Sequence, residues 1–541
     1  MKKNVLALSI AAMIGGLGFA GIAAADVVVG SGGAGGTVGT TGAAKGVWIP
    51  NATTASTAWM LSATNTRDLS VTQGGTGHSL VVPYFNAQNG NMTVLHVVNT
   101  DQDHGKLAKV RFRSAANSDD ILDFQVFLSP GDVWTAAVTA GSDGVAQLTT
   151  ADGTCTLPAL AKGVSQRFVT DRLSDKAGDV AAQTREGYVE IFNMADIDGN
   201  KFYGTNRNAN SDLYTAIKHV NGTAPCTSSV LNQTLDNITT EAAARTLGLD
   251  TPTTGLMGDW YIINVGQSTT FAGAATALTA VTTVGGTTAG RGNFVHFPQI
   301  DTSVSAASID QFTADPLLRT RAYRTDSVLN KTGGKVSASV ALAAGNYDLP
   351  DMSTPYLAAD LGNPKAQAIA LTSALAVTSV TNQYANDESI SAKTDWVFSM
   401  PTRRYAVAVD YAAKSVLFNN AVNTHFTSAN TSLNATTLQA CVTPGGAMKG
   451  YSREEDTQST FVISPDTALK LCGETSVLTF GSEKVLKASI AARTVPVNYA
   501  EGWLTVGTTG LGNGLPVIGY AATKAAGATN LGGTWMHRTS K

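Results

Sequence analysis

The stretch Ala108-Lys109-Val110-Arg111-Phe112-Arg113 decides the fold of this chain. Basic and apolar side chains alternate along it with a period of two. Successive side chains of a β-strand point to opposite faces of the sheet, so this pattern predicts a strand with one buried face and one solvated face. Val110 and Phe112 would then face the core, and the three basic side chains would face water.

Similar runs of five to eight residues surround this stretch, and Asn, Asp, Gly or Pro bounds each of them. They are rich in Val, Phe and Trp, which fit a pleated and half-buried surface. Short strands at this spacing are typical of antiparallel sandwiches. The expected fold class is therefore mainly β, with antiparallel Ig-like sandwiches. The runs are 81–85, 92–98, 121–128, 133–138 and 187–194.

The expected domain organisation follows from where these patterns begin and change. A Gly- and Thr-rich arm or linker spans 26–77, and a first β-sandwich spans 78–200. A mixed α/β region covers 201–390, where an Asn-Pro pair begins a helix expected over 365–376. A β-region spans 391–541, and its strands could complete the first sheet. Other expected elements are a helix over 317–324 and strands over 260–265, 336–340, 396–400, 405–409, 459–463, 476–480 and 503–506.

The first 25 residues have the three parts of a Sec signal peptide. Lys2 and Lys3 form the basic region, 5–14 is the apolar region, and a triple Ala ends just before Asp26. We therefore expect export by the Sec pathway to the cell surface or the extracellular space. No later segment combines the length and apolarity of a membrane-spanning helix, so no transmembrane segment is expected after cleavage.

Charged residues make up only 14% of the chain, and the formal net charge is −3. Thr, Ser, Asn and Gly take the place of the missing charges, a composition that is common in exported β-proteins. A weakly acidic chain has no electrostatic reason to bind nucleic acid. The composition indicates neutral surfaces that suit contacts with other copies of the chain or with components of the cell envelope.

The four cysteines are Cys155, Cys226, Cys441 and Cys472. An even number of cysteines in an exported chain indicates disulfides, and four cysteines allow three pairings. The pairs Cys155–Cys226 and Cys441–Cys472 are favoured because each pair lies within one half of the chain. A metal site is disfavoured because the cysteines are widely spaced along the sequence.

Two acidic turns are candidate calcium sites. Asp101 and Asp103 alternate ahead of a glycine, and so do Asp196 and Asp198. Converging carboxylates are the ligands that Ca²⁺ prefers, and both turns resemble the first half of a calcium-binding loop. Neither turn continues to a Glu at the twelfth position, and ordinary hairpin turns use the same residue types. Ca²⁺ is therefore a candidate cofactor, with a plain turn as the alternative.

The chain contains none of the common hydrolase motifs. The seven histidines are scattered, and neither H-E-x-x-H nor G-x-S-x-G occurs. No catalytic residue is assigned, and we do not expect the chain to be an enzyme. Trp134, Trp260, Trp396 and Trp503 each lie in a strand pattern, where a position in the core is favoured over stacking on a sugar.

A set of stretches spread over most of the mature chain carries a resemblance. They are VPYF at 82–85 with VNTD at 98–101, VRFR at 110–113 with NSDDI at 117–121, LSPGDVW at 128–134, REGYVEI at 185–191, LPD at 349–351, DWV at 395–397 with PTRR at 401–404, and LPVIG at 515–519. Together they resemble a family of exported proteobacterial cell surface proteins. The resemblance implies a location at the cell surface, with surface-layer subunits among its members, and it carries over no catalytic or metal residue.

These observations support one leading hypothesis and two alternatives. The leading hypothesis is a structural, self-assembling protein of the bacterial envelope, of which a surface-layer subunit is one form. Neutral faces and strand edges would carry its lateral association. The first alternative is a secreted or surface adhesin or other binding module, whose binding could depend on calcium. The second is a secreted hydrolase without a recognised motif.

Overall fold

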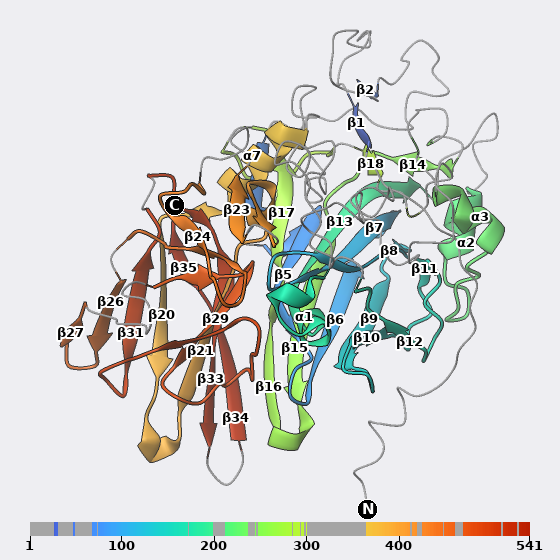
Figure 1. Cartoon of the computed structure of the whole chain (residues 1–541). Helices are drawn as coiled ribbons and strands as arrows, with labels where there is room; N and C mark the ends of the chain where they lie inside the picture. The colour runs from blue at the N-terminus through green and yellow to red at the C-terminus, as the bar shows by residue number, and fades with distance from the viewer. Residues whose placement is uncertain are drawn as a thin grey trace, which may run out of the picture.

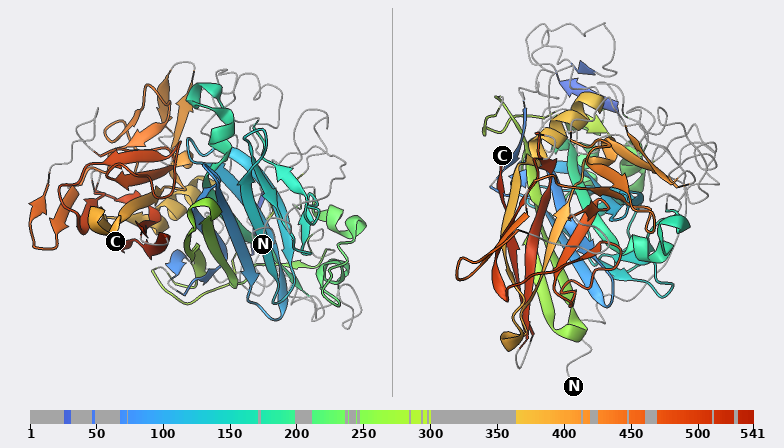
Figure 2. Two further views of the ribbon diagram at one scale, coloured as in Figure 1. Left: turned by 90° about the horizontal axis from the view of Figure 1, so that it is seen from below. Right: turned by 60° about the vertical axis from the view of Figure 1, so that its left-hand side comes forward.

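A computed structural model shows two β-rich modules side by side (Figures 1 and 2). It describes residues 26–30, 47–48, 68–198, 211–299 and 364–541. The gaps inside these ranges are 73, 171–172, 236–237, 239–243, 245–246, 284, 293, 297–298, 412–413, 419–424, 447, 460–468, 510–511 and 527–529. The signal peptide expected over 1–25, most of the arm, and the elements expected over 317–324, 336–340 and most of 459–463 lie outside the described residues.

The N-terminal module, residues 68–299, contains two antiparallel sheets. Its strands are β3 (Asp68–Thr72), β4 (Thr76–Gly77), β5 (Ser79–Asn86), β6 (Asn91–Asn99), β7 (His104–Ser114), β8 (Asp120–Leu128), β9 (Val133–Ala140), β10 (Ala146–Thr149), β11 (Cys155–Leu157), β12 (Ser165–Arg167), β13 (Glu186–Asp198), β14 (Leu249–Asp250), β15 (Leu256–Asn264), β16 (Thr269–Ala274) and β17 (Thr276–Val281). One sheet has the order β12-β10-β9-β6-β15-β16, with β4 on β15. The other has the order β11-β8-β7-β13-β5-β17-β3, with β14 on β13.

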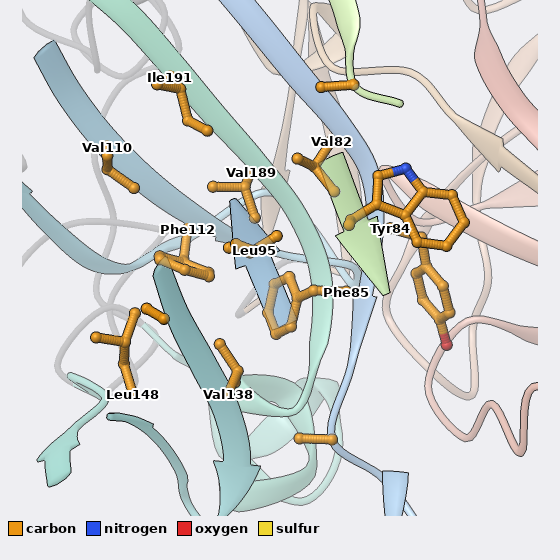
Figure 3. Close-up of a cluster of buried hydrophobic side chains, with 14 of the residues drawn as sticks. Val82, Tyr84, Phe85, Leu95, Val110, Phe112, Val138, Leu148, Val189 and Ile191 are labelled. Atoms are coloured by element: carbon orange, nitrogen blue, oxygen red, sulfur yellow. The ribbon is translucent and has the colours of Figure 1, made fainter. Parts of the chain in front are cut away.

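Apolar side chains from the two sheets fill the space between them (Figure 3). Val110 and Phe112 of β7 point into this core, as the alternation predicts, and both are fully buried. The ring of Phe112 meets the ring of Phe85 edge-on, with centroids 5.4 Å apart, and Leu95 approaches from the opposite sheet. Burying one such side chain stabilises the fold by roughly 1.5–3 kcal/mol.

The C-terminal module, residues 364–541, contains two five-stranded sheets. Its strands are β19 (Ala376–Val377), β20 (Ser379–Ala385), β21 (Lys393–Ser399), β22 (Val407–Asp410), β23 (Ser415–Phe418), β24 (Thr431–Leu433), β25 (Ala440–Val442), β26 (Met448–Ser452), β27 (Thr457–Gln458), β28 (Leu471–Cys472), β29 (Thr475–Phe480), β30 (Ala492–Val495), β31 (Glu501–Gly507), β32 (Leu515–Pro516), β33 (Ile518–Ala526), β34 (Asn530–Met536) and β35 (Arg538–Ser540). The sheets have the orders β27-β26-β31-β20-β35 and β30-β29-β21-β33-β34. Trp396, Tyr384 and Phe480 pack together in the core of this module.

In the described residues, helices are short and lie around the sheets. They are α1 (Val180–Thr184), α2 (Asp212–Ile217), α3 (Ser228–Leu231) and α7 (Pro364–Leu375), with the 3₁₀ turns η1 (Asp175–Ala177), η2 (Asn232–Thr234), η3 (Val265–Gln267), η8 (Glu388–Ile390) and η9 (Arg403–Tyr405). A small separate sheet joins β1 (Asp26–Gly30), β2 (Val47–Trp48) and β18 (Phe294–His296). The helix predicted over 365–376 is confirmed as α7. The strand predicted over 405–409 is shorter, because η9 occupies its start and β22 begins only at Val407.

The predicted fold class, mainly β, is confirmed, but the first sandwich does not end near residue 200. Strands β15, β16 and β17 take places inside its two sheets. β15 pairs with β6 over nine residues, and its side chains alternate between buried and partly exposed positions, which matches the pleat. Strands of the last third do not complete the first sheet. They pair among themselves, because the segment 256–281 already fills those places.

Both favoured disulfides, Cys155–Cys226 and Cys441–Cys472, are present. The first ties β11 to the segment before α3, and the second joins the paired strands β25 and β28. Disulfides form and persist in oxidising compartments, whereas the cytoplasm keeps thiols reduced. The two bridges therefore indicate a protein that folds outside the cytoplasm.

The second face of β7 is the main departure from the predicted pattern. The alternation predicts that Lys109, Arg111 and Arg113 face water, yet each is at most 1% exposed. Neighbouring strands supply opposite charges at matching positions, since Arg111 lies opposite Asp123 of β8 and Glu190 of β13. Buried charges are tolerated when they are paired. Here the strand register itself provides the pairing, which is why both faces of β7 can be buried.

The C-terminal module contributes to this charged face. Nη2 of Arg404, in η9, lies 3.3 Å from Oε1 of Glu190, and Nε of Arg113 lies 3.4 Å from Oε2 of the same carboxylate. The adjacent Arg403 pairs with Glu474 at 2.7 Å. Glu474 also accepts a hydrogen bond from the backbone N–H of Arg404 at 2.8 Å. The two modules therefore share one buried ion-pair network.

Replacing Arg404 with Met should remove the contact of Glu190 with the C-terminal module. Removing one member of a buried ion pair typically costs about 3–5 kcal/mol, so the urea midpoint of unfolding should fall clearly. The control is Arg538→Met, an exposed position in the same module, which should change the free energy of unfolding by less than about 0.5 kcal/mol. Equal midpoints for the two variants would contradict the shared network.

Candidate functional site

The acidic residues predicted as calcium ligands lie on segments that the sheet brings together. Asp101 lies in the turn between β6 and β7, and Asp196 lies near the end of β13. Lys106 stands opposite Asp196 in the register, and its Nζ is 2.7 Å from Oδ1 of Asp196 and 3.0 Å from Oδ2 of Asp101. The same ammonium donates to Oγ1 of Thr253 at 2.6 Å. A lysine therefore occupies the point where the two carboxylates converge.

The other two predicted ligands lie to the side of this lysine-centred cluster. Asp103 is exposed, and its backbone N–H donates to Oδ1 of Asp101 at 2.9 Å. Asp198 is buried at the end of β13, opposite His104 in the register. Among the described residues, the acidic and imidazole side chains close enough to share one ion are Asp101, His104 and Asp196. Sequence reasoning passed over His104, although it follows the acidic turn directly.

The charges of this cluster already balance one another. Burial alone would raise the pKa of Asp101, but hydrogen bonds from His104 and Lys106 hold that pKa well below its usual range. The same hydrogen bond with Asp101 raises the pKa of His104. A carboxylate that already faces an ammonium and an imidazole offers little net attraction to a divalent cation. Whether these four aspartates bind calcium is untested, but the contacts of Lys106 favour the alternative of a structural ion cluster without a metal.

A second set of polar groups fastens the loop between β29 and β30 to the N-terminal module. Glu186, the first residue of β13, accepts hydrogen bonds from the backbone N–H groups of residues 489–491. The side chains of Asn86 and Asn91 both donate to the carbonyl oxygen of Leu486, at 2.7 and 2.8 Å. Three side chains of one module thus hold backbone groups of the other.

Asp395 of β21 holds the same loop from the C-terminal module. Its Oδ2 accepts a hydrogen bond from the backbone N–H of Leu486 at 2.8 Å. Burial raises the pKa of Asp395 to about 7, although the Leu486 hydrogen bond and the nearby Lys484 ammonium act in the opposite direction. The side chain of Asp395 therefore changes charge near neutral pH at a point where the two modules meet.

A groove opens on the C-terminal module where β20, β31 and β26 lie side by side. It encloses about 700 Å³. Its lining combines aromatic side chains with charged and amide groups, which is the usual composition of a site for a small or polymeric ligand. The lining residues that matter here are Gln383, Tyr451, Arg453, Glu455, Glu501 and Trp503.

A row of side chains crosses the three strands at this groove. Trp503 of β31 lies between Gln383 of β20 and Tyr451 of β26 in the register of the sheet. The rings of Tyr451 and Trp503 stack with centroids 4.3 Å apart and planes inclined by only 12°. Trp503 remains 43% exposed. Large aromatic side chains are seldom left this open, so the stacked pair marks the groove as a candidate binding site.

The predicted core position is confirmed for Trp134, Trp260 and Trp396, which are fully buried, and is wrong for Trp503. The reason lies in the alternation along β31. Leu504 and its apolar neighbour two positions on face the core, so Trp503 must face outward. In the sequence Trp-Leu-Thr-Val, each face of the strand would carry at least one apolar residue. The sequence pattern alone therefore does not decide which face is buried.

Charged side chains stand at the end of the groove. Arg453 forms ion pairs with Glu501 and with Glu454, the latter at 2.8 Å. Glu455 lines the groove as well. The lining therefore contains one guanidinium, that of Arg453, and two carboxylates, those of Glu455 and Glu501, which leaves an excess of negative charge.

Ser129, His219 and Asp132 lie together but do not form a catalytic relay. Oγ of Ser129 is 3.5 Å, and Oδ2 of Asp132 is 3.6 Å, from the same ring nitrogen, Nδ1 of His219. A serine nucleophile needs its base on one ring nitrogen and the orienting carboxylate on the other. This cluster therefore provides no mechanism for the hydrolase alternative.

No family model matches the chain, and neither a curated protein nor a solved structure matches it. Within the described ranges, every helix is too short or too polar to cross a membrane.

Calcium should leave the wild-type protein unchanged, because Lys106 lies between the carboxylates that would bind the ion. We expect the melting temperature to be the same with Ca²⁺ and with a chelator. Replacing Lys106 with Met should cost about 3–5 kcal/mol, and Ca²⁺ should restore part of that loss. Lys449→Met, at an exposed position, is the matched control. A calcium-dependent rise in the wild-type melting temperature would contradict this interpretation.

Replacing Asp395 with Asn should change how stability depends on pH. The pKa of Asp395 is higher in the folded chain than in the unfolded chain, so its favourable contribution is complete below about pH 4 and is lost as the pH rises through about 7. The wild type should therefore lose on the order of 4 kcal/mol relative to Asp395→Asn between about pH 4 and pH 8. Urea titrations across this range measure the difference.

The matched control for that experiment is Asp175→Asn, because Asp175 is exposed. Its stability difference from the wild type should stay nearly constant with pH. If the Asp395→Asn difference is equally flat, Asp395 does not titrate as described.

Proposed function

We propose that this chain is an exported structural protein of the bacterial cell envelope that associates laterally with copies of itself. The observation that carries the proposal is the placement of charge. Eighteen charged side chains are buried in the described part of the chain, and many of them pair with one another. They are Lys106, Lys109, Arg111, Arg113, Asp119, Asp120, Asp123, Glu186, Glu190, Asp196, Asp198, Asp250, Lys393, Asp395, Arg403, Arg404, Glu474 and Lys524.

Because these charged side chains are buried, the surface carries even fewer charges than the composition implies. Only 14% of the residues carry a charge, and each buried ion pair removes two of them from contact with water. Strong net charge keeps copies of a protein apart, whereas a nearly neutral surface gives little repulsion. A Thr-, Ser- and Asn-rich exterior of this kind favours packing of copies side by side.

The junction of the two modules suits a rigid building unit. Glu474 donates its backbone N–H to the carbonyl oxygen of Ala115 at 2.8 Å. Next to it, a Cβ on Gly473 would lie 2.3 Å from that same oxygen, so the two backbones approach as closely as glycine allows. Modules in one chain usually move relative to each other unless their interface is extensive. Here backbone contacts, buried ion pairs and the loop held by Glu186 act together.

Exposed aliphatic side chains at one end offer a contact between copies. Val265 is 72% exposed in the turn between β15 and β16, Ile390 is 55% exposed in the turn between β20 and β21, and Leu531 is 67% exposed at the start of β34. Both turns and the start of β34 lie at the lower end of the molecule in Figure 1. We call these three residues the apolar tips. Burying them between copies would be favourable.

The envelope location in this proposal rests on two supports. The leader expected over the first 25 residues would direct Sec export, and the two disulfides indicate folding in an oxidising compartment. A binding module is the second candidate function, and the exposed stack of Tyr451 and Trp503 is the observation that favours it.

Purified mature protein beginning at Asp26 should form large oligomers or ordered sheets, seen by sedimentation and by electron microscopy. Changing all three apolar tips to Asp should shift it to monomers without lowering the melting temperature, because these side chains are exposed. Val220→Asp is the matched control, since Val220 is 61% exposed in the turn after α2.

Two outcomes would contradict separate parts of this proposal. A wild-type protein that stays monomeric at every concentration would rule out lateral association. A triple variant that assembles like the wild type would show that copies meet elsewhere than at the apolar tips.

A further inference from the structure

We infer that the groove formed by β20, β31 and β26 binds a neutral polysaccharide. This inference goes beyond the proposed structural function, and it needs the groove to be open outside the cell but does not need copies to associate. Its starting point is the stack of Tyr451 and Trp503, which lies open on a sheet face. Trp503 is 43% exposed, so part of its ring remains accessible to a ligand.

An open aromatic face selects a particular kind of ligand. Sugar rings carry an apolar face of C–H groups and a rim of hydroxyl groups, so they pack on an aromatic ring and still need hydrogen bonds at the edge. Trp503 provides the ring, and Gln383 stands beside it on the next strand. The amide of Gln383 both donates and accepts hydrogen bonds, which matches neighbouring sugar hydroxyls. A ring with an amide next to it fits a pyranose better than a purely apolar chain.

Charged groups at the end of the groove can bind further hydroxyl groups. The guanidinium of Arg453 and the carboxylate of Glu501 form an ion pair at this end of the groove. Both groups keep further hydrogen-bonding positions, because a guanidinium has five N–H donors and a carboxylate has about four acceptor positions.

The sign of the charge narrows the class of polysaccharide. Arg453 faces Glu454 and Glu501, and Glu455 adds another carboxylate to the lining. An anionic polymer such as a polyuronate or a nucleic acid would meet net repulsion at this end. A neutral glycan has no such cost, so hexose and N-acetylhexosamine chains fit the groove best.

The same sheet face continues away from the groove as a polar strip. Two residues further along the strands, Thr505 of β31 lies between Thr381 of β20 and Lys449 of β26. The hydroxyl of Thr381 donates to that of Thr505 at 2.9 Å. Because residues two apart share one face of a strand, this strip lies on the same side as Trp503. A chain of several sugar units could therefore extend from the groove along the sheet.

Isothermal titration of the mature protein tests the inference. The probes are cellohexaose, the N-acetylglucosamine hexamer and, as the anionic comparison, polygalacturonate. At least one neutral hexamer should bind with a Kd below about 1 mM. Trp503→Leu, which keeps an apolar side chain but removes the flat ring, should weaken that binding at least about tenfold. Gln383→Ala should weaken it by a smaller factor.

The matched control is Tyr261→Ala in the N-terminal module. Tyr261 packs against His96 of the adjacent strand β6, with ring centroids 5.4 Å apart and both side chains partly exposed. The two residues therefore form a similar surface aromatic pair, but on the other module. This variant should bind the hexamer like the wild type. Melting temperatures confirm that each variant is folded. If Trp503→Leu does not fold, Gln383→Ala alone decides, since it changes no core residue.

Three results would overturn the inference. The first is that neither neutral hexamer binds. The second is that folded Trp503→Leu, or Gln383→Ala in its place, binds as tightly as the wild type. The third is that polygalacturonate binds more tightly than both neutral hexamers. Saccharide binding can also be titrated with the triple variant of the apolar tips, which we expect to be monomeric. A failure of lateral association therefore stays distinguishable from a failure of saccharide binding.

Discussion

The pairing of buried charges across strands β7, β8 and β13 is the constraint on which this structure depends. Arg111 cannot be removed from water alone, because an unpaired buried charge costs several kcal/mol. The register of the sheet places Asp123 on one side of it and Glu190 on the other. Once these charges are paired, the second face of the sheet can be covered, and Arg404 of the C-terminal module joins the same network. A sheet with two buried faces thereby links the modules.

Two properties of the molecule follow from this arrangement. The modules are fastened by ion pairs and by backbone contacts such as that between Glu474 and Ala115, and these contacts oppose relative movement of the modules. Charged side chains that are buried in the network are also absent from the surface, so small uncharged polar residues dominate the exterior. Rigidity and a neutral exterior are what a protein that packs beside its own copies requires. The groove at Trp503 lies on the C-terminal module, on strands that take no part in this network.

Much of the fold could be predicted from local patterns. Alternation in the strands between 81 and 138 placed them correctly, and the even number of cysteines with their positions indicated the right disulfides. Alternation shows that the two faces of a strand differ, but it does not show what covers the polar face. Part of the signal was present, because Asp123 lies in the run that directly follows that of Arg111, whereas Glu190 comes from a run much further along the chain. Matching charges on adjacent strands, rather than charges on one strand, indicate a buried polar face.

The candidate sites were less predictable. The acidic turns were recognised, but Lys106 sits inside an alternating strand, and nothing local indicates that its ammonium reaches both Asp101 and Asp196. The residues next to Trp503 in the sequence are those of a typical buried strand. Trp503 is nevertheless exposed, because tertiary packing decides which face of β31 is turned toward the core. The place of 256–281 inside the first sheets depends in the same way on long-range pairing, for which a single sequence carries no direct signal.

A double-mutant cycle between Glu190 and Arg404 tests the central claim most directly. The free energies of unfolding of the wild type, Glu190→Gln, Arg404→Met and the double variant give the interaction energy of the two side chains. A buried pair that joins the modules predicts a coupling energy of about 2 kcal/mol or more, because each single substitution already removes the interaction that both variants lack. Losses that simply add, with a coupling near zero, would contradict a buried charge network as the link between the two modules.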